Sequence, residues 1–159
     1  MTVVPAELVA TAKAFSNVEW DLVLDDVVAR VRDDDIVEFL ESVRDAGYEL
    51  FIDLCAVDYL TRDPRFEISI NLVSVAQSAR LRVLVGVAGT DPTMSTITTV
   101  YPGADFYERE AFDLFGVVFV GHPDLTRILL PDEWEGHPLR KDVAVGGISV
   151  QFKEAKTSR

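Results

Sequence analysis

The two histidines are the side chains best suited to chemistry, and each precedes a proline: His122 stands before Pro123, and His137 before Pro138. A metal site would need both imidazoles to converge with a carboxylate such as Asp124. Residues before proline are extended, and the histidines lack the i, i+4 spacing of helical ligands. An imidazole titrates near neutral pH, so a small His-dependent hydrolase or isomerase stays a remote alternative, although no nucleophile with its base is recognisable. We therefore expect no metal site and no catalytic residue.

Bound cofactors are equally unsupported by the residue pattern. The single cysteine, Cys55, cannot hold an iron–sulfur cluster or form a disulfide within the chain, and its apolar neighbours predict an inert buried thiol. Gly146 and Gly147 do not form a glycine-rich turn between a strand and a helix, so no phosphate-binding loop is present. We expect no cofactor-binding residue in this chain.

Composition narrows the class of partner. The chain has 159 residues, 48% of them hydrophobic, and a net charge of −12. That size suits one domain, and phosphates of nucleic acids or anionic lipids would repel the surface. Residues 1–63 hold 15 acidic against 5 basic side chains, so the acidity is concentrated in the first third. No sequence segment is apolar enough to span a bilayer, so we expect membrane association only through a partner protein.

The hydrophobic periodicity predicts an α+β fold with helices packed on a mixed sheet, in the order α-β-β-α-β-β-β-α. A single domain is expected over residues 1–135, with an extended docking tail over 136–159. Gly47 and Gly116 are expected to terminate the second and third helices. The expected helices cover 4–15, 33–46 and 104–115, and the expected strands cover 20–24, 27–31, 49–60, 66–76, 80–88 and 117–120.

The third helix carries charges at spacings that suggest structural roles. Arg109 lies one turn from both Asp105 and Asp113, so we expect it to pair with one of them or with a buried carbonyl. Glu108 and Glu110 are two apart and point in different directions, which is poor geometry for shared acid–base work. The residues expected to be structural are Glu108, Arg109, Glu110, Asp113 and Gly116.

The C-terminal third has the pattern of a docking segment because three prolines hold it extended and polar side chains recur between them. Arg140 and Lys141 stand together on an acidic chain, which suits a partner that presents carboxylates. The residues expected at a partner interface are His122, Pro123, Asp124, Arg127, Trp134, His137, Pro138, Arg140, Lys141 and Asp142.

Several sequence blocks, in order, carry a resemblance to one family. They are residues 101–110 (YPGADFYERE), 113–116 (DLFG), 121–125 (GHPDL), 127–131 (RILLP) and 134–142 (WEGHPLRKD). The blocks resemble the signature of the C subunit of NADH-quinone oxidoreductase, respiratory complex I, which is named the J subunit in photosynthetic organisms. The departures are small: Asp105-Phe106-Tyr107 replaces the usual Asn-Trp-Tyr, and Val143 replaces a common tyrosine.

The resemblance implies a non-catalytic, cofactor-free subunit of the peripheral arm in a proton-translocating enzyme. NADH, FMN, iron–sulfur clusters and quinone would all be bound by other chains. The implied partners are the D subunit, which lines the quinone cavity, and the ferredoxin-like cluster subunit, on the cytoplasmic side of the cell membrane. Related subunits occur in membrane-bound hydrogenases and in dehydrogenases that use other donors, and these remain alternatives.

Overall fold

The computed structural model describes residue 8, residue 15, residues 17–23 and residues 26–143. The predicted first helix, over residues 4–15, therefore lies almost entirely outside the described residues; of its members, Leu8 is helical and fully buried. The described elements are β1 (Glu19–Val23), β2 (Asp26–Val31), the 3₁₀ helix η1 (Asp33–Asp35), α2 (Ile36–Asp45), β3 (Leu50–Asp58), β4 (Phe66–Ser74), β5 (Ala79–Val87), β6 (Thr93–Ser95), the 3₁₀ helix η2 (Pro102–Ala104), α3 (Asp105–Phe115) and β7 (Val118–Val120).

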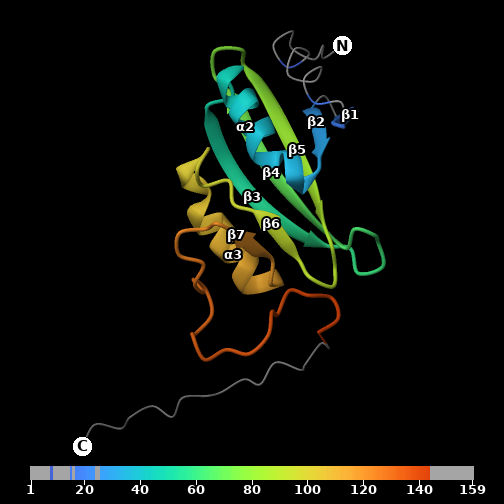
Figure 1. Cartoon of the computed structure of the whole chain (residues 1–159), viewed down its shortest axis with the longest axis vertical. Coiled ribbons are helices and arrows are strands. Elements are labelled where there is room, and N and C mark those ends of the chain that lie inside the picture. The colour runs from blue at the N-terminus through green and yellow to red at the C-terminus, as the bar shows by residue number, and fades with distance from the viewer. Residues whose placement is uncertain (1–7, 9–14, 16, 24–25, 144–159) are drawn as a thin grey trace, which may run out of the picture.

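Five strands form one mixed sheet in the order β1-β2-β5-β4-β3 (Figure 1). Neighbours pair antiparallel except β2 and β5, which run parallel because the chain passes through α2, β3 and β4 before β5 returns beside β2. The predicted α+β class and mixed sheet are confirmed.

One face of the sheet forms the core. In β4, Phe66, Ile68, Ile70 and Leu72 point to this face and are at most 1% exposed. The helix α2 packs on the same side through Ile36, Phe39, Leu40 and Val43, all fully buried, as their spacing predicts. It ends before Gly47, whose φ of +97° few other residues adopt.

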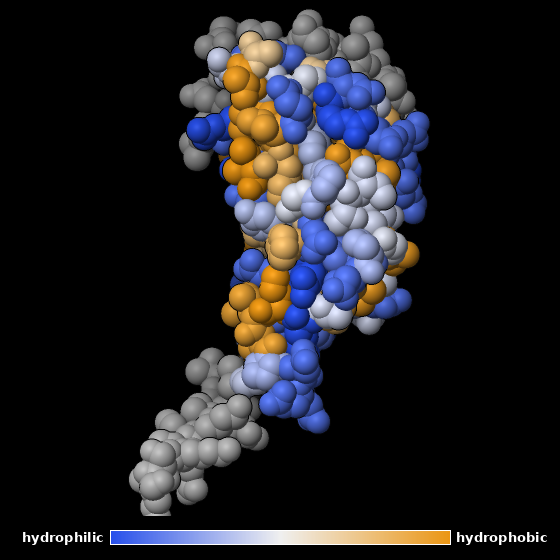
Figure 2. Space-filling view, turned by 90° about the vertical axis from the view of Figure 1, so that its left-hand side faces the viewer, coloured by the Kyte–Doolittle hydropathy of each residue, from blue (hydrophilic) through white to orange (hydrophobic). Residues whose placement is uncertain are grey.

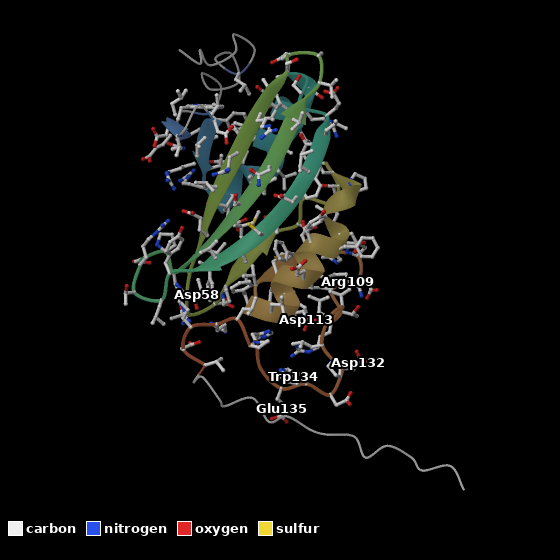
Figure 3. The ribbon with its side chains drawn as sticks, turned by 180° about the vertical axis from the view of Figure 1, so that it is seen from behind. Asp58, Arg109, Asp113, Asp132, Trp134 and Glu135 are labelled. Atoms are coloured by element: carbon white, nitrogen blue, oxygen red, sulfur yellow. The ribbon has the colours of Figure 1, made fainter. Side chains whose placement is uncertain are left out.

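The opposite sheet face is seen from behind in Figure 3, with its polar side chains standing out from the strands. Asn71 donates to Asp53 at 2.6 Å and accepts from Arg82 at 3.2 Å, which makes a polar row across three strands. Cys55 lies in β3 and is exposed, so the prediction of a buried thiol was wrong. The physical reason is strand alternation: Leu54 takes the core side at 3% exposure, and Cys55 points away from it.

A second layer beside β3 consists of α3 and the short parallel pair β6–β7 (Figure 1). Phe51 of β3 packs edge-on against Tyr107 of α3, with ring centroids 5.4 Å apart. The sequence predicts the strand near residue 118, but it does not predict its pairing with β6. From Gly121 to Val143 the described chain has no helix or strand and runs along the end of α3.

Candidate functional site

The carboxylate of Asp113 organises the loop that follows α3. Its side chain is fully buried, and Oδ2 accepts backbone N–H groups from three consecutive residues: Ile128 at 3.1 Å, Leu129 at 2.8 Å and Leu130 at 2.9 Å. Oδ1 accepts from Arg127. Burial alone would raise the pKa of Asp113, but the backbone donors and the guanidinium outweigh it and lower that pKa. The loop backbone from 127 to 130 is thereby fixed to the helix.

Arg127 and His137 tie a later part of the chain to the same helix. The backbone carbonyl of Asp113 accepts from Arg127 Nη1 at 3.3 Å and from His137 Nδ1 at 2.9 Å. Since a carbonyl oxygen only accepts, this His137 nitrogen carries the proton. Arg127 Nη2 donates to the carbonyl of Gly136 at 3.1 Å, so one guanidinium spans α3 and the segment before His137.

Arg109 also holds the loop, by a route other than the predicted ion pairs. Its guanidinium donates to the carbonyls of Thr126 at 3.2 Å and Arg127 at 3.3 Å, and to the Thr126 hydroxyl at 3.0 Å. The structure gives it no ion pair with Asp105 or Asp113. Asp113 is already filled by loop donors, which explains the difference. Among the described residues Arg109 therefore bonds backbone carbonyls, but the contacts with Thr126 are exposed and the carbonyl of Arg127 is only partly buried, whereas the sequence predicts a buried carbonyl.

The start of the loop is held inside the domain by His122. Its side chain is fully buried, and Nδ1 accepts the backbone N–H of Asp124 at 3.0 Å, so the proton is on Nε2. Nε2 lies 3.3 Å from the carbonyl of Asp105 and 4.0 Å from the buried Glu108 carboxylate. Glu108 accepts from Thr96 at 2.6 Å and from Ile97 N at 2.7 Å, while burial raises its pKa. The buried His122 side chain cannot touch a partner itself, so it would act at an interface only by fixing the position of the loop.

A second buried aspartate, Asp58 at the end of β3, fixes the end of the described chain. Its carboxylate accepts two bonds from Arg65, at 2.7 and 2.9 Å, and the backbone N–H of Lys141 at 2.8 Å. The Arg65 bonds hold the pKa of Asp58 well below its usual range, against the opposing effect of burial. Arg65 also bonds Asp142 at 2.8 Å, and this lowers the pKa of Asp142.

Arg140 sits against the domain instead of extending into solvent. Its guanidinium lies 5.2 Å from the centre of the Phe66 ring and donates to the carbonyl of Gly89 at 3.4 Å. The Leu139 N–H donates to the carbonyl of Leu114 at 3.0 Å. The segment 136–142 was predicted to be extended, but it makes two turns: the Arg140 N–H donates to the carbonyl of His137 at 3.2 Å, and the Val143 N–H donates to the carbonyl of Arg140 at 3.1 Å. The rest of the predicted tail, residues 144–159, lies outside the described residues.

The other predicted residues lie on or beside this loop (Figure 3). Trp134 is half-buried, whereas Pro123, Asp124, Lys141 and the α3 residue Glu110 are exposed. Pro138 is half-buried next to His137. The predicted interface residues thus follow α3 from Asp105, which His122 contacts, to Asp113, and the last of them lie beside Asp58 and Phe66. Their contact with a partner stays a prediction.

Gly116 is required by its conformation and by the approach of His137. Its φ is +75°, and a Cβ atom there would lie 2.5 Å from His137 Cδ2. The His137 ring cannot retreat without losing its bond to Asp113, so Gly116→Ala should lower the free energy of unfolding by about 2–4 kcal/mol. Urea denaturation measures this loss.

Gly136→Ala is the matched control for Gly116→Ala. Gly136 has a φ of +85° but no atom within 4 Å of an added Cβ, so only the backbone term applies, about 1 kcal/mol. Equal losses for the two variants would show that His137 does not constrain Gly116.

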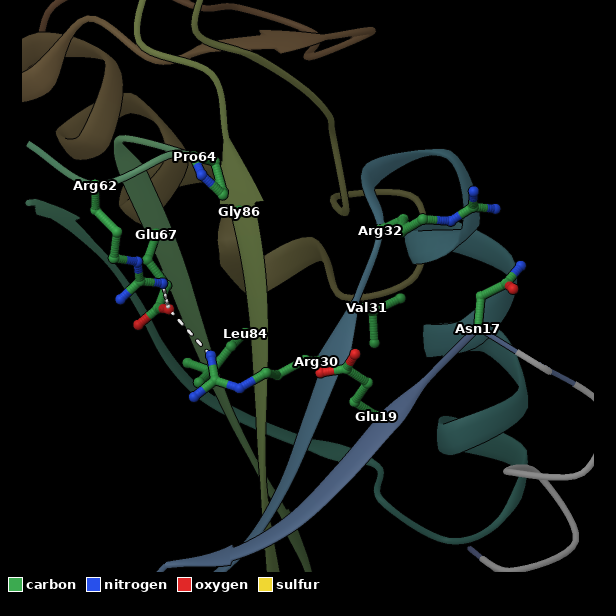
Figure 4. A pocket seen from close by; sticks show the side chains of 10 residues that line it. All are labelled: Asn17, Glu19, Arg30, Val31, Arg32, Arg62, Pro64, Glu67, Leu84 and Gly86. Atoms are coloured by element: carbon green, nitrogen blue, oxygen red, sulfur yellow. Dashed lines mark hydrogen bonds and ion pairs between the residues drawn. The ribbon is translucent and has the colours of Figure 1, made fainter.

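The hollow in Figure 4 lies elsewhere, on the sheet face opposite α2. It has a volume of about 310 Å³, and neither histidine lines it. Its central carboxylate, Glu67, bonds Arg30 at 3.2 Å and Tyr59 at 3.3 Å, and it also pairs with Arg62. The charge of Glu67 is therefore already paired with arginines of the hollow itself.

Metal binding and membrane insertion find no support in the described part of the chain. Its residues contain no group of three or more His, Cys, Asp or Glu side chains that could hold a metal ion. Nor is any of its helices long and apolar enough to cross a bilayer.

Comparison with known proteins shows which family this chain belongs to. Residues 29–149, which include the whole loop, match the family described as the 30 Kd subunit of respiratory-chain NADH dehydrogenase. The chain belongs to this family. The resemblance of its sequence blocks to the C subunit is confirmed, since the NADH-quinone oxidoreductase C subunit of Roseiflexus castenholzii is 48% identical over 118 residues, covering 74% of this chain and 68% of the relative.

Other members of the family align over different lengths. The C subunit of Salinispora tropica is 40% identical over 149 residues, covering 90% of this chain and 61% of the relative. A solved structure, the trypsin-resistant fragment of Nqo5, is 31% identical with a TM-score of 0.67, covering 74% of this chain and 96% of the fragment. A chain in the archaeal membrane-bound sulfane sulfur reductase has a TM-score of 0.78 at 24% identity, covers 96% of each chain, and so shares the fold.

Proposed function

We propose that the chain is a cofactor-free, non-catalytic subunit in the peripheral arm of a proton-translocating NADH-quinone oxidoreductase, where it supports assembly. The carrying observation is family membership with up to 49% identity to proteins named as the C subunit of NADH-quinone oxidoreductase. The chain spans 57–68% of the length of these relatives. We assign the NADH-quinone reductase activity to the complex and not to this chain alone.

The site supports docking better than chemistry. The imidazoles of His122 and His137 both bond backbone groups. The carboxylates of Asp113 and Asp58 already accept hydrogen bonds from loop N–H groups. None of these four side chains is therefore placed for proton transfer to a substrate. What the loop offers instead is a fixed surface. The proposed neighbours are the D subunit, which lines the quinone cavity, and the ferredoxin-like cluster subunit, on the cytoplasmic side of the membrane. The chain would reach the membrane only through them.

A second candidate is the equivalent subunit of another respiratory membrane complex, such as a membrane-bound hydrogenase or a dehydrogenase with another donor. The observation that favours it is the shared fold with the chain in the sulfane sulfur reductase. The identity of the electron donor to the purified complex separates the two candidates.

Deletion of the gene in its host tests the proposal. We expect membranes to lose NADH-quinone reductase activity and the assembled complex on a native gel, and both to return with the wild-type chain. The purified chain itself should oxidise no NADH and show no flavin or cluster absorbance. Full activity in the deletion strain would contradict the proposal, as would stoichiometric flavin or iron in the purified chain.

A further inference from the structure

The bonds to Asp113 leave two large apolar side chains facing solvent. The N–H groups of residues 128, 129 and 130 all point inward to Oδ2 of Asp113. The side chains of Ile128 and Leu129 are therefore held in fixed directions. Ile128 is 37% exposed and Leu129 is 59% exposed. Contact between water and large apolar side chains is unfavourable, so the fixed exposure of Ile128 and Leu129 needs an explanation.

The support under these two residues is unusually complete for a loop. Arg127 and Asp113 hold them from one side, and Arg109 holds the preceding residues through three hydrogen bonds. A surface that is already ordered loses little conformational entropy on binding.

The loop residues on either side of this apolar pair are acidic. Asp124, Asp132, Glu133 and Glu135 are all exposed, and within the described residues none of their carboxylates forms an ion pair. Figure 3 shows Asp132 and Glu135 on the loop below Arg109 and Asp113. Figure 2 shows two groups of hydrophobic residues on one side of the molecule, a larger one in the upper half and a smaller one in the lower half, with hydrophilic residues beside the lower group.

We propose that Ile128 and Leu129 form an anchor that inserts into an apolar pocket on a neighbouring protein of the complex, and that Lys and Arg side chains border this pocket. Charge complementarity selects the occupant: four exposed carboxylates that form no ion pair among the described residues flank the apolar pair in the loop sequence, and they fit a pocket with a basic rim. A second copy of this chain fits poorly, because a two-fold contact would bring identical acidic residues together on a chain of net charge −12. The inference rests on the proposed function and names the residues through which the chain docks.

The test compares Leu129→Ser with Val75→Ser in the full chain, each expressed in the deletion strain. Val75 is 61% exposed at the turn after β4, away from the loop, so it matches Leu129 in exposure and in apolar character. Melting temperatures of both purified variants should stay within about 2 °C of wild type, because neither side chain is in the core. Incorporation into the complex should fall at least about tenfold for Leu129→Ser and stay unchanged for Val75→Ser.

A charge variant supplies the second arm. The triple change Asp132→Lys, Glu133→Lys and Glu135→Lys should also reduce incorporation, and raising the salt concentration should diminish the difference from wild type by screening the repulsion. Equal incorporation of wild type, Leu129→Ser and the triple variant would overturn the anchor. So would a wild-type chain that is a dimer by analytical ultracentrifugation and becomes a monomer with Leu129→Ser. In both cases assembly of the wild type would leave the proposed function standing, whereas failure of the wild type to assemble would remove that function itself.

Discussion

Asp113→Asn is expected to lower the free energy of unfolding by about 3–5 kcal/mol, because it breaks a buried ion pair and a three-donor acceptor site together. The amide presents one oxygen where the carboxylate presents two, and its NH₂ group faces either Arg127 or the loop N–H groups. Donor then meets donor in a fully buried position. Urea denaturation followed by tryptophan fluorescence measures the loss, and Trp134 in the loop provides a local signal.

Glu110→Gln is the control for Asp113→Asn. Glu110 lies on the same helix but is exposed, so its neutralisation should change stability by less than about 0.5 kcal/mol. A matching small loss for Asp113→Asn would mean that its carboxylate does not hold the loop. Asp113→Asn should also impair assembly, since a mobile loop no longer presents Ile128 and Leu129 in fixed directions.

Asp58→Asn is expected to cost about 2–4 kcal/mol and to reduce the sensitivity of the protein to acid. The substitution weakens the two bonds to Arg65, whose side chain is 15% exposed, and leaves Asp142 as the one carboxylate that pairs with this guanidinium among the described residues. It also removes a charged acceptor from the N–H of Lys141, so residues 140–142 should loosen from the domain.

The direction of the pH effect follows from the lowered pKa of Asp58. The folded state binds the Asp58 proton more weakly than the unfolded state does, so the stabilisation is complete above the unfolded pKa of about 4 and is lost as the pH falls below it. Wild type should lose stability steeply between about pH 4 and pH 2, and Asp58→Asn should lose less over that range. Asp113 contributes in the same direction, so some acid sensitivity remains. Parallel curves for the two proteins would contradict the role given to Asp58.

Local pattern predicted those elements whose signal lies within one segment. Alternation in β4 predicts that Phe66, Ile68 and Ile70 share a face, and helical spacing with Gly47 predicts α2 and its end. The pairing of β6 with β7 could not be predicted in this way, because each has three residues and their parallel contact depends on how α3 folds back between them. The side taken by Cys55 depends on the register of β3, which includes an irregularity between Phe51 and Asp53.

The candidate site was predicted as a set of residues and not as a set of contacts. Asp113, Arg127 and His137 were each singled out, yet nothing in their spacing indicates that one carboxylate binds three consecutive amides. Asp58 and Arg65 were not among the predicted site residues. A carboxylate at the end of one strand and an arginine just before the next is a usable signal for such a clamp, because the hairpin brings both ends together.

Affinity purification of the tagged wild-type chain from detergent-solubilised membranes of its host tests the central claim most directly. The account predicts that flavin- and cluster-bearing chains and NADH-quinone reductase activity co-purify in constant proportion to the tagged chain. Recovery of the chain alone, with the reductase activity left in the unbound fraction, would contradict it.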